Sequence, residues 1–284
     1  MARVKLVLAF IALVILAAGV AGAAWYWEKI ARVDMKMSQE IEGRGGEKRD
    51  VPDLGKRHFD KAIELLREGE LQAAQETLYY LLEYYPESET YPEARRILGE
   101  VNLDLLISKT PLEGKTEYTV RGGDAPITIA RKAKTTIDYI MRANGKMSAM
   151  IYKDEKLTVY PLEFELDIHL ADRKVIVTTK DGKFFKEYEI LDTNLPSTLK
   201  APVSTTLKAK VAWHGDRYVS IREKQYMNAQ KWMQSGKQGL FIRHVPQTPP
   251  AEKENAPYGV MLSKPDFEEL FTIIRTGSPV RLHS

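Results

Sequence analysis

Cysteine is absent from the 284 residues of this sequence. Its absence excludes disulfide bonds, thiolate ligands to a metal ion and a cysteine nucleophile. Histidine is scarce, and no pair shows the His-x-x-x-His or His-Glu-x-x-His spacing that places two imidazoles on one metal ion. The five histidines are His58, His169, His214, His244 and His283. The sequence therefore predicts neither a metal site nor a cofactor.

A charge excess of either sign is also missing. The chain has 42 Lys and Arg and 39 Asp and Glu, a net charge of +3, with the two signs interleaved. Because no basic stripe and no RNA-binding signature occurs, nucleic acid is not expected as a partner. Hydrophobic residues make up 44% of the chain, which is enough for a buried core. The length suits two or three compact units of about 100–150 residues each.

The N-terminus carries a long uncharged apolar run, residues 6–27, which follows Arg3 and Lys5. At roughly 20 residues per bilayer crossing, this run is long enough to span a membrane. A cleavable signal peptide is the alternative, because Ala21-Gly22-Ala23 resembles a cleavage site. We favour an uncleaved anchor, since signal h-regions run only about 7–15 residues and this run ends in Trp25-Tyr26-Trp27. The preceding positive charges predict that the rest of the chain lies outside the cytoplasm.

Residues 28–52 are polar, which predicts a flexible linker, and residues 53–108 show apolar positions at helical spacing in three segments. The pattern resembles a tetratricopeptide helical hairpin of at most one and a half repeats. The residues that carry this resemblance are Gly69, Ala74, Leu78, Leu81, Pro86, Ala94, Leu98 and Gly99. Such repeats need about three copies to be stable alone. The unit is therefore expected to pack on its neighbours or on itself. We favour a helical spacer between membrane and wall; a protein-binding groove is the alternative.

Residues 118–161 combine a strand-like start, two short helical patterns and a closing strand. This β-α-α-β order resembles the LysM family of glycan-binding modules. The matching positions are Tyr118-x-Val120, Gly123-Asp124, Ile129-Ala130, Thr136-x-x-x-Ile140, Asn144, Ile151-Tyr152 and Leu157-x-Val159. Ala125-Pro126 and Asp154-Glu155 depart from the family pattern, which has Thr-Leu and Gly-Gln there. The resemblance implies binding to a polymer that contains N-acetylglucosamine, and hence peptidoglycan as partner.

Two segments of this unit are the candidate glycan-binding site, because in the family they line a shallow groove. The candidate residues are Gly123, Asp124, Ala125 and Pro126 in the first segment and Met150, Ile151 and Tyr152 in the second. For Gly123 and Asp124 we rate structural roles, a turn and a helix cap, above direct contact with a ligand. Ala125 and Pro126 offer fewer hydrogen bonds than Thr-Leu, so weak binding is expected.

Beyond Pro161 the apolar spacing changes to two, which predicts a mainly-β region at residues 163–284. Asp181-Gly182 is a hairpin-turn pair, and a helical pattern covers residues 266–274. The order of features resembles the L,D-transpeptidase catalytic domain, whose members cross-link peptidoglycan stem peptides. The residues that carry the resemblance are Asp181-Gly182-Lys183, Ala201-Pro202, Gly239-x-x-Ile242, Tyr258-Gly259, Leu262-Ser263-x-x-Asp266-x-x-x-Leu270 and Gly277-x-Pro279-Val280.

The catalytic motif of that family is degenerate here. The positions concerned are Tyr258, Gly259 and Val260, with Arg243 and His244 upstream. Val260 stands for the nucleophilic cysteine and Tyr258 for a histidine; valine has no lone pair, so cysteine chemistry is excluded. Arg243 aligns with the upstream histidine, and a strand would point His244 to the opposite face. Nothing in the sequence supplies Ser263 with the base and oxyanion hole that a serine nucleophile needs.

These observations predict a multidomain α+β fold class. The predicted parts are a transmembrane anchor or signal (1–27), a linker (28–52), a tetratricopeptide-like α-hairpin (53–108), a βααβ LysM module (116–161) and a mainly-β L,D-transpeptidase-like domain (163–284). The predicted location is single-pass in a bacterial inner or cytoplasmic membrane, with most of the chain in the periplasm or cell wall, or secreted if the signal is cleaved.

The predicted function is a membrane-anchored, peptidoglycan-binding cell-wall protein whose transpeptidase-like domain is inactive. Its predicted partners are peptidoglycan, through the glycan and a stem peptide, the membrane through residues 6–27, and a protein through residues 53–108. Two alternatives to this function stay open. One is an active L,D-transpeptidase that uses non-standard residues, and the other is a helical scaffold that recruits a cell-wall enzyme.

Overall fold

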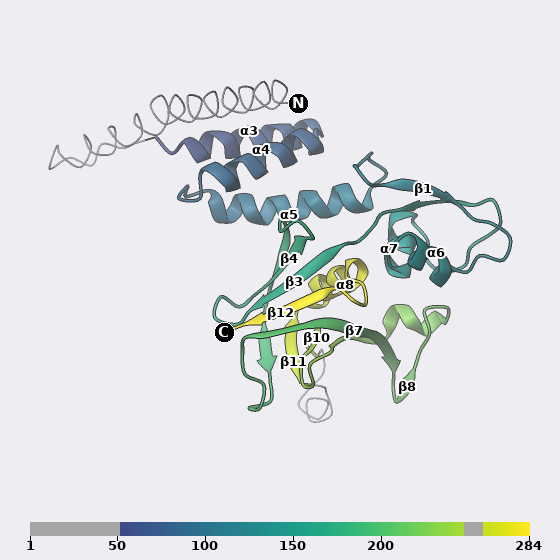
Figure 1. Ribbon diagram of the computed structural model, residues 1–284. Coiled ribbons are helices and arrows are strands. Elements are labelled where there is room, and N and C mark those ends of the chain that lie inside the picture. Colours follow the sequence, from purple (N-terminus) through teal and green to yellow (C-terminus); the bar gives the residue numbers. More distant parts are fainter. Residues whose placement is uncertain (1–51, 247–257) are drawn as a thin grey trace, which may run out of the picture. The chain divides into compact units, whose positions relative to one another are not determined.

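The computed structural model describes residues 52–246 and 258–284, and Asp53–Ser284 forms one compact unit (Figure 1). Within the two described ranges, no helix has the length and apolar character needed to cross a bilayer. This finding contradicts the predicted transmembrane fold class and the single-pass location, and both are withdrawn. The described residues give no support for the membrane as a partner. The segments that carried these predictions, residues 6–27 and the linker up to residue 51, lie outside the described residues.

Three helices begin the described chain: α3 (Leu54–Glu68), α4 (Leu71–Tyr84) and α5 (Tyr91–Ile107). They correspond to the three predicted helical segments. Helix α3 ends where Gly69 adopts a φ of 81°, a left-handed conformation that lets its N–H reach the last free carbonyls. Helix α4 ends one residue before Tyr85, which precedes Pro86 and is therefore disfavoured in the helical region. The helices share a small core of Ala62, Leu78, Leu81, Ala94, Leu98, Val101 and Leu105.

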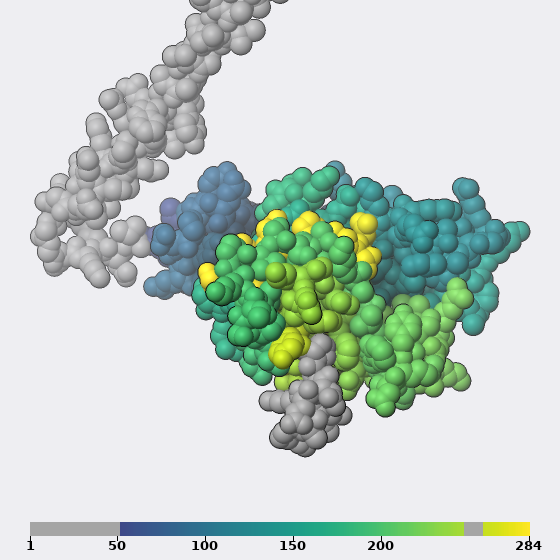
Figure 2. Space-filling view, turned by 60° about the horizontal axis from the view of Figure 1, so that its bottom comes forward, coloured from purple at the N-terminus to yellow at the C-terminus, as the bar shows by residue number. Residues whose placement is uncertain are grey.

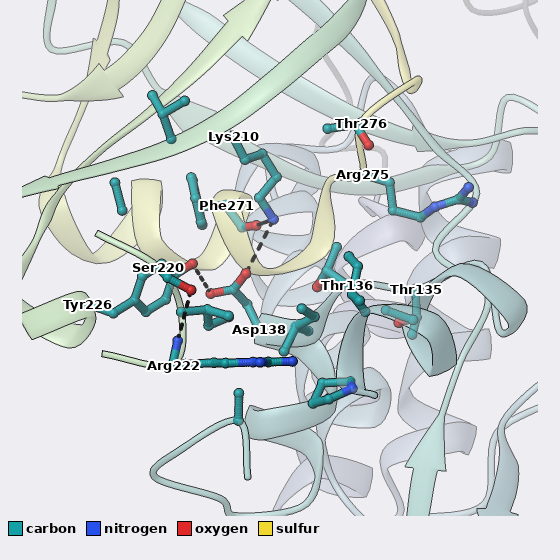
Figure 3. Close-up of a pocket in the computed structure, with 18 of the residues that line it drawn as sticks. Thr135, Thr136, Asp138, Lys210, Ser220, Arg222, Tyr226, Phe271, Arg275 and Thr276 are labelled. Carbon is teal, nitrogen blue, oxygen red and sulfur yellow. Dashed lines mark hydrogen bonds and ion pairs between the residues drawn. The ribbon is translucent and has the colours of Figure 1, made fainter. Parts of the chain in front are cut away.

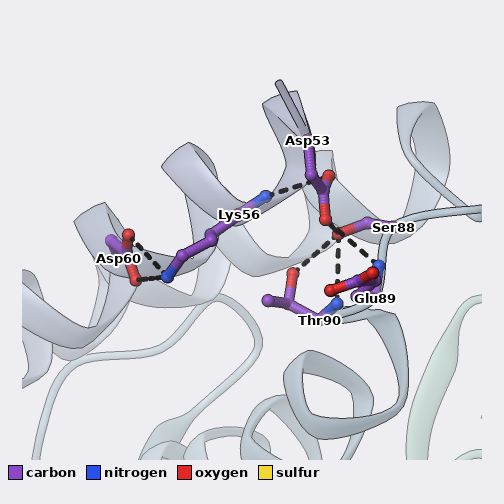
Figure 4. Close-up of polar contacts among 6 residues, drawn as sticks. All are labelled: Asp53, Lys56, Asp60, Ser88, Glu89 and Thr90. Atoms are coloured by element: carbon purple, nitrogen blue, oxygen red, sulfur yellow. Dashed lines mark hydrogen bonds and ion pairs between the residues drawn. The ribbon is translucent and has the colours of Figure 1, made fainter. Parts of the chain in front are cut away.

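Asp53 fixes the start of α3 (Figure 4). One carboxylate oxygen accepts a hydrogen bond from the backbone N–H of Lys56 at 3.2 Å, which satisfies one of the free donors of the first turn. The other accepts from the Ser88 hydroxyl at 2.8 Å and from the Glu89 N–H at 3.1 Å. The hydrogen bond from Ser88 is the largest cause of the lowered pKa of Asp53. Asp53 therefore ties the first helix to the loop between α4 and α5.

Helix α5 packs on the edge strand β5 (Phe184–Glu189). The Asn102 side chain donates to the Phe185 carbonyl at 2.7 Å, and the buried Lys186 ammonium lies 2.8 Å from the Glu100 carboxylate. The Tyr79 hydroxyl on α4 donates to another β5 carbonyl. Of the two expected modes of packing, both occur: the helices share a core of their own, and α4 and α5 also contact β5. One face of the helices is thereby covered.

Residues 116–159 form the predicted strand–helix–helix–strand order, called here the βααβ unit. It consists of β1 (Thr116–Thr119), α6 (Pro126–Lys132), α7 (Ile137–Ala143) and β2 (Lys156–Val159). The two strands are antiparallel, with Thr116 opposite Val159. The helices pack on them through Val120, Ile129, Ala130, Ile140, Leu157 and Val159.

The remaining strands form one large sheet. They are β3 (Phe164–His169), β4 (Lys174–Thr179), β5, β6 (Asp192–Asn194), β7 (Val203–His214), β8 (Arg217–Tyr218), β9 (Gln230–Ser235), β10 (Phe241–His244), β11 (Gly259–Leu262) and β12 (Pro279–His283). Their order is β5-β4-β3-β12-β7-β9-β10-β11-β6, with β8 on β7. The pairs β3–β12 and β10–β11 are parallel.

Strand β7 makes this sheet curl. Its first residues pair with β12 and its later ones with β9, and the register shifts between Leu207 and Ala209. The hairpin turn predicted at Asp181-Gly182 is present, with Gly182 at a positive φ of 78° between β4 and β5, and Gly215, at a φ of 59°, turns the chain between β7 and β8. Helix α8 (Lys264–Ile273) completes the core with Phe267, Leu270 and Phe271.

The βααβ unit shares this core. Tyr139 and Ala143 of α7 belong to the same buried cluster as α8 and the sheet, while Ile140 belongs to the small core of the βααβ unit itself. The Tyr139 hydroxyl donates to the Leu106 carbonyl of α5 at 2.9 Å. Helix α7 therefore has two buried faces. The predicted multidomain α+β class is corrected to one mixed α/β unit built on a curled sheet.

Candidate functional site

The first candidate glycan-binding segment is a tight turn between β1 and α6. Gly123 has a φ of 87°, which glycine adopts without strain. The Asp124 carboxylate accepts from the Arg121 N–H at 2.9 Å and from the Tyr118 hydroxyl at 2.8 Å, and it pairs with Lys132 at 3.4 Å. These contacts, the Arg121 N–H first, lower the pKa of Asp124. Its carboxylate thus holds the turn together.

Asp124 does not cap α6, which was one of the two structural roles expected. The N-cap residue is Ala125, whose side chain cannot accept a hydrogen bond, and Pro126 occupies the first turn. Proline is favoured there because its missing N–H would have no partner in the helix. Ala125 and Pro126 therefore begin the helix through backbone geometry alone.

The second candidate segment presents side chains outward. Met150 is 60% exposed and Tyr152 is 64% exposed, whereas Ile151 packs against the small core. The Tyr152 hydroxyl lies 2.9 Å from the Met150 sulfur. The Tyr152 N–H donates to the Glu155 carboxylate at 2.9 Å, so the backbone of this segment is fixed. An aromatic ring beside a thioether offers an apolar platform for a ligand.

Residues that adjoin the two segments are bonded to each other. Val120, directly after β1, exchanges two backbone hydrogen bonds with residues that follow the second segment, one with Asp154 and one with Glu155, each 2.8 Å long. Pro126 of the first segment and Ala149, next to Met150, line the same cavity. The chain on either side of the two segments is therefore held in one part of the βααβ unit.

The transpeptidase-like motif lies in the strands of the sheet. Val260 on β11 is fully buried, opposite Ile242 on one side and Thr193 on the other. Both edges of β11 are paired, so its backbone N–H groups donate to the neighbouring strands β10 and β6 and cannot form an oxyanion hole. A Cβ on Gly259 would lie 2.1 Å from the Phe241 carbonyl oxygen, so only glycine fits there.

Arg243 and His244 point to opposite faces of β10, as a strand requires. His244 packs toward α8, with its ring centroid 6.0 Å from that of Phe267, and its Nδ1 lies 2.9 Å from the Val245 carbonyl oxygen. Arg243 is buried on the other face, where burial lowers its pKa. Tyr258, before β11, is half exposed.

The hydroxyl nearest to the motif has a structural role. Ser263 is the N-cap of α8, and its Oγ accepts from the Asp266 N–H at 3.2 Å. A nucleophilic serine would instead need a base within about 3 Å. None is bonded to Ser263 in the part of the chain that the structure describes.

One group of side chains has the geometry of metal ligands. Asp167, His169 and His283, on β3 and β12, place ligand atoms within 4.8 Å of one another. However, Asp167 accepts two hydrogen bonds from Arg281, at 2.6 and 2.8 Å, and they are the largest cause of its lowered pKa. A guanidinium beside the carboxylate repels a cation. We assign this group to the stabilisation of the β3–β12 pair.

A cavity of about 590 Å³ adjoins the βααβ unit (Figure 3). Helices α6 and α7 form one wall, and strand β7, the loop after β8 and the end of α8 form the other. Figure 2 shows the βααβ unit (teal) and the segment around β8 (light green) on the same side of the molecule. The sequence gives no local signal for this cavity, because its walls come from residues 126–149 and 210–276.

A polar cluster lies in the cavity wall. The Tyr226 hydroxyl donates to Asp138 at 2.8 Å, and the Lys210 ammonium lies 3.6 Å from the same carboxylate. The ammonium also donates to the Phe271 carbonyl and lies 4.2 Å from the centre of that ring. Burial lowers the pKa of Lys210 and is the first cause of the raised pKa of Tyr226. The Lys210 ammonium and the Tyr226 hydroxyl are therefore the partners of the Asp138 carboxylate within the protein.

No protein-family model and no curated protein matches the chain. Solved structures show a partial likeness. An L,D-transpeptidase from Stackebrandtia nassauensis matches with a TM-score of 0.30 and 14% identity over 52% of this chain and 65% of that one. The catalytic domain of an E. faecium L,D-transpeptidase, acylated by ertapenem, matches with a TM-score of 0.28 and 16% identity over 42% of this chain and 96% of that one.

A further structure is a fused Zn-dependent amidase/peptidase/peptidoglycan-binding domain-containing protein from Clostridium acetobutylicum. It matches with a TM-score of 0.32 and 9% identity, over 43% of this chain and 52% of that one. The chain thus spans between about half and two thirds of two of these three structures. Every TM-score is below 0.5, so the function proposed below rests on the residues and contacts of this chain.

Proposed function

We propose that this protein binds peptidoglycan without cleaving or cross-linking it. The glycan is held at the βααβ unit, by the turn at residues 123–126 and the segment at residues 150–152. The observation that carries the proposal is the exposed pair Met150 and Tyr152, in a segment followed by Asp154 and Glu155, which bond to Val120 shortly before that turn. Sugar rings stack on aromatic side chains through their C–H faces, and an exposed tyrosine offers an apolar body and a polar tip.

The enzyme alternative receives no support from the geometry of the motif. Val260 is packed in the core, and Ser263 and His244 bond to backbone groups. We therefore propose that the transpeptidase-like part serves as a rigid base for the βααβ unit, through the core shared by α7 and α8.

Sedimentation of the full chain with purified sacculi tests the proposal. We expect the chain to pellet with the sacculi, and Tyr152→Ala to weaken binding about tenfold, since one stacked aromatic is worth about 1.4 kcal/mol. The matched control is Tyr80→Ala, an exposed tyrosine on α4 that is 44% exposed. A chain that stays in the supernatant at low salt, or variants that bind alike, would sink the proposal.

Mass spectrometry of the muropeptides after incubation tests the absence of catalysis. We expect the same products as in buffer. Release or exchange of a terminal D-alanine would show that the motif region works with other residues.

A further inference from the structure

The cavity beside the βααβ unit has an exposed apolar side chain on each of its two walls. Ile127, in the first turn of α6, is 52% exposed, and Tyr218, on β8, is 55% exposed; both residues line the cavity. Single exposed apolar residues are common on protein surfaces, but these two come from distant parts of the chain and border one cavity. The cavity therefore offers apolar surface to a ligand from two sides.

The ring of Tyr218 is held in place by its neighbours. Tyr218 pairs with Trp213 across the β7–β8 hairpin, and the two rings meet edge-on with their centroids 6.4 Å apart. Val219, the next residue, is fully buried, and its N–H donates to the Ala212 carbonyl at 2.9 Å. An aromatic side chain that is fixed before binding loses little conformational entropy when a ligand stacks on it. Tyr218 is thus a preformed platform.

Buried polar contacts fix the distance between the two walls (Figure 3). Asp138, on α7 in the first wall, accepts from the Tyr226 hydroxyl at 2.8 Å and lies 3.6 Å from the Lys210 ammonium, and both of these partners belong to the second wall. The Thr136 hydroxyl, at the start of α7, donates to the Thr272 carbonyl of α8 at 2.5 Å. These contacts join the walls, so the cavity keeps its width. A cleft of fixed width suits a ligand of constant cross-section, such as a linear polymer.

The lining of the cavity also contains hydrogen-bond donors. The Ser220 oxygen accepts from the Arg222 N–H at 3.4 Å, which leaves the Ser220 O–H to donate, and Arg131 presents an exposed guanidinium from α6. Apolar surface with a few polar groups is the usual composition of a small-molecule site. A sugar ring matches this composition, because its C–H faces stack on apolar side chains and the oxygens at its rim accept hydrogen bonds.

The cavity begins where the proposed glycan site ends. Pro126 is the last residue of the first candidate segment and Ala149 precedes Met150, and both line the cavity. Its volume of about 590 Å³ falls within the roughly 300–1,000 Å³ of small-molecule sites. A glycan chain that lies on the two segments can therefore continue into the cavity without leaving the protein surface.

We propose that this cavity is a two-walled glycan cleft, in which the chain held at residues 123–126 and 150–152 continues and stacks one of its sugar rings on Tyr218. The proposal rests on the proposed function and extends it to residues outside the βααβ unit. The ligand is a linear glycan of several sugars, and the strand β8 of the transpeptidase-like part contributes to its binding. The protein therefore prefers long glycan strands to short ones.

Calorimetry on the full chain tests this proposal with a disaccharide and a hexasaccharide from peptidoglycan whose peptides an amidase has removed. We expect the hexasaccharide to bind about tenfold more tightly, the effect of one additional stacked aromatic ring. Tyr218→Ala removes this advantage and leaves the affinity for the disaccharide unchanged, whereas Tyr218→Phe keeps the ring and the advantage. The matched control is Tyr80→Ala, on α4, at a tyrosine that is 44% exposed, and it also keeps the advantage.

The outcomes separate the two proposals. If neither oligosaccharide binds, the proposed function fails. If both bind equally tightly, or if Tyr218→Ala binds the hexasaccharide as tightly as Tyr80→Ala does, only the cleft is refuted.

Alkylation of a single introduced thiol gives an independent test that leaves Tyr218 intact. Because the chain has no cysteine, Arg222→Cys places one thiol at the second wall, where Arg222 is exposed and lines the cavity. Hexasaccharide at ten times its Kd leaves the cleft open for roughly a tenth of the time, so it should slow alkylation by iodoacetamide about tenfold. The matched control is Arg57→Cys, at an exposed position of α3, which removes equal charge and should react at the same rate with and without the sugar.

An unchanged rate at Arg222→Cys in the presence of bound hexasaccharide would overturn the proposal, since the sugar chain would then lie outside the cleft. Protection by the free stem peptide, but not by the hexasaccharide, would assign the cavity to a peptide and refute the glycan cleft as well.

Discussion

The βααβ unit and the β10–β11 region are the two regions whose sequence suggested a resemblance to cell-wall proteins, and they differ in solvent exposure. At the first, Met150 and Tyr152 are 60% and 64% exposed, and Ala149, which precedes them, lines a cavity. At the second, Val260 is completely buried and β11 is paired along both edges. Side chains that bind a ligand must reach solvent. Of the two resemblances in sequence, one therefore lies at an accessible surface and the other in the core, and only the first leaves side chains free to meet a ligand.

The largest effect that we expect comes from Gly259→Ala. Its Cβ would meet the Phe241 backbone carbonyl at 2.1 Å, and a backbone atom cannot move aside without breaking the β10–β11 pairing. We expect a loss of about 3 kcal/mol or more in the free energy of unfolding, measured by urea denaturation.

The control for this change is Gly122→Ala, in the turn of the βααβ unit, where an added Cβ would meet nothing within 4 Å. We expect Gly122→Ala to change the free energy of unfolding by no more than about 0.5 kcal/mol. Equal stabilities of the two variants would show that β11 is not the tightly packed element described above.

A smaller effect is expected from Val260→Cys, which returns a thiol to the motif position. Because Val260 is fully buried, burial would raise the pKa of the thiol and keep it inert. We expect a loss of about 1 kcal/mol in stability, no reaction with iodoacetamide under native conditions, and no release of D-alanine from tetrapeptides.

Prompt alkylation of the folded Val260→Cys variant would contradict the difference in exposure between the two regions, since it would mean that position 260 is as accessible as the glycan-binding segments. The reagent control is Met150→Cys, at a side chain that is 60% exposed and should react at once.

Local signals in the sequence predicted the elements well. Gly69 and Gly182 mark the end of a helix and a hairpin turn because each needs a positive φ, which is a property of single residues. The apolar spacing of two beyond Pro161 predicted strands, and the first of them, β3, buries Phe164, Leu166 and Ile168 on one face. The strand–helix–helix–strand order of residues 116–159 also followed from spacing alone.

Properties that depend on distant residues were not predictable in this way. The shared core arises because α7 buries Tyr139 on one side and Ile140 on the other, and a pattern cannot tell which core a buried residue joins. Strand β12 lies between β3 and β7, an order set by long-range pairing. The cavity joins Asp138 to Lys210 and Arg275. These residues are too far apart in the chain for any motif to connect them.

The smallest effect that we expect concerns the charge that holds the glycan-binding turn. Asp124→Asn keeps the shape of the side chain but weakens the hydrogen bonds from Arg121 and Tyr118, so the affinity for glycan should fall about threefold at pH 7. The pKa of Asp124 is lowered in the folded protein, the Arg121 N–H being the first cause. The charge of Asp124 therefore stabilises the turn fully above the ordinary pKa of 3.8, and this stabilisation is lost as the pH falls through the lowered pKa.

Glycan binding of the parent protein, titrated downward from pH 7, should therefore show a step at acidic pH that Asp124→Asn lacks. The matched control is Asp154→Asn, in the neighbouring hairpin, where the carboxylate is 77% exposed and asparagine tolerates the φ of 66°. That variant should keep both the affinity and the acid step, because its charge holds no part of the turn. If Asp154→Asn instead abolished the step, the charge that matters would lie at Asp154, after the second segment, and the turn at Asp124 would owe its shape to Gly123 alone.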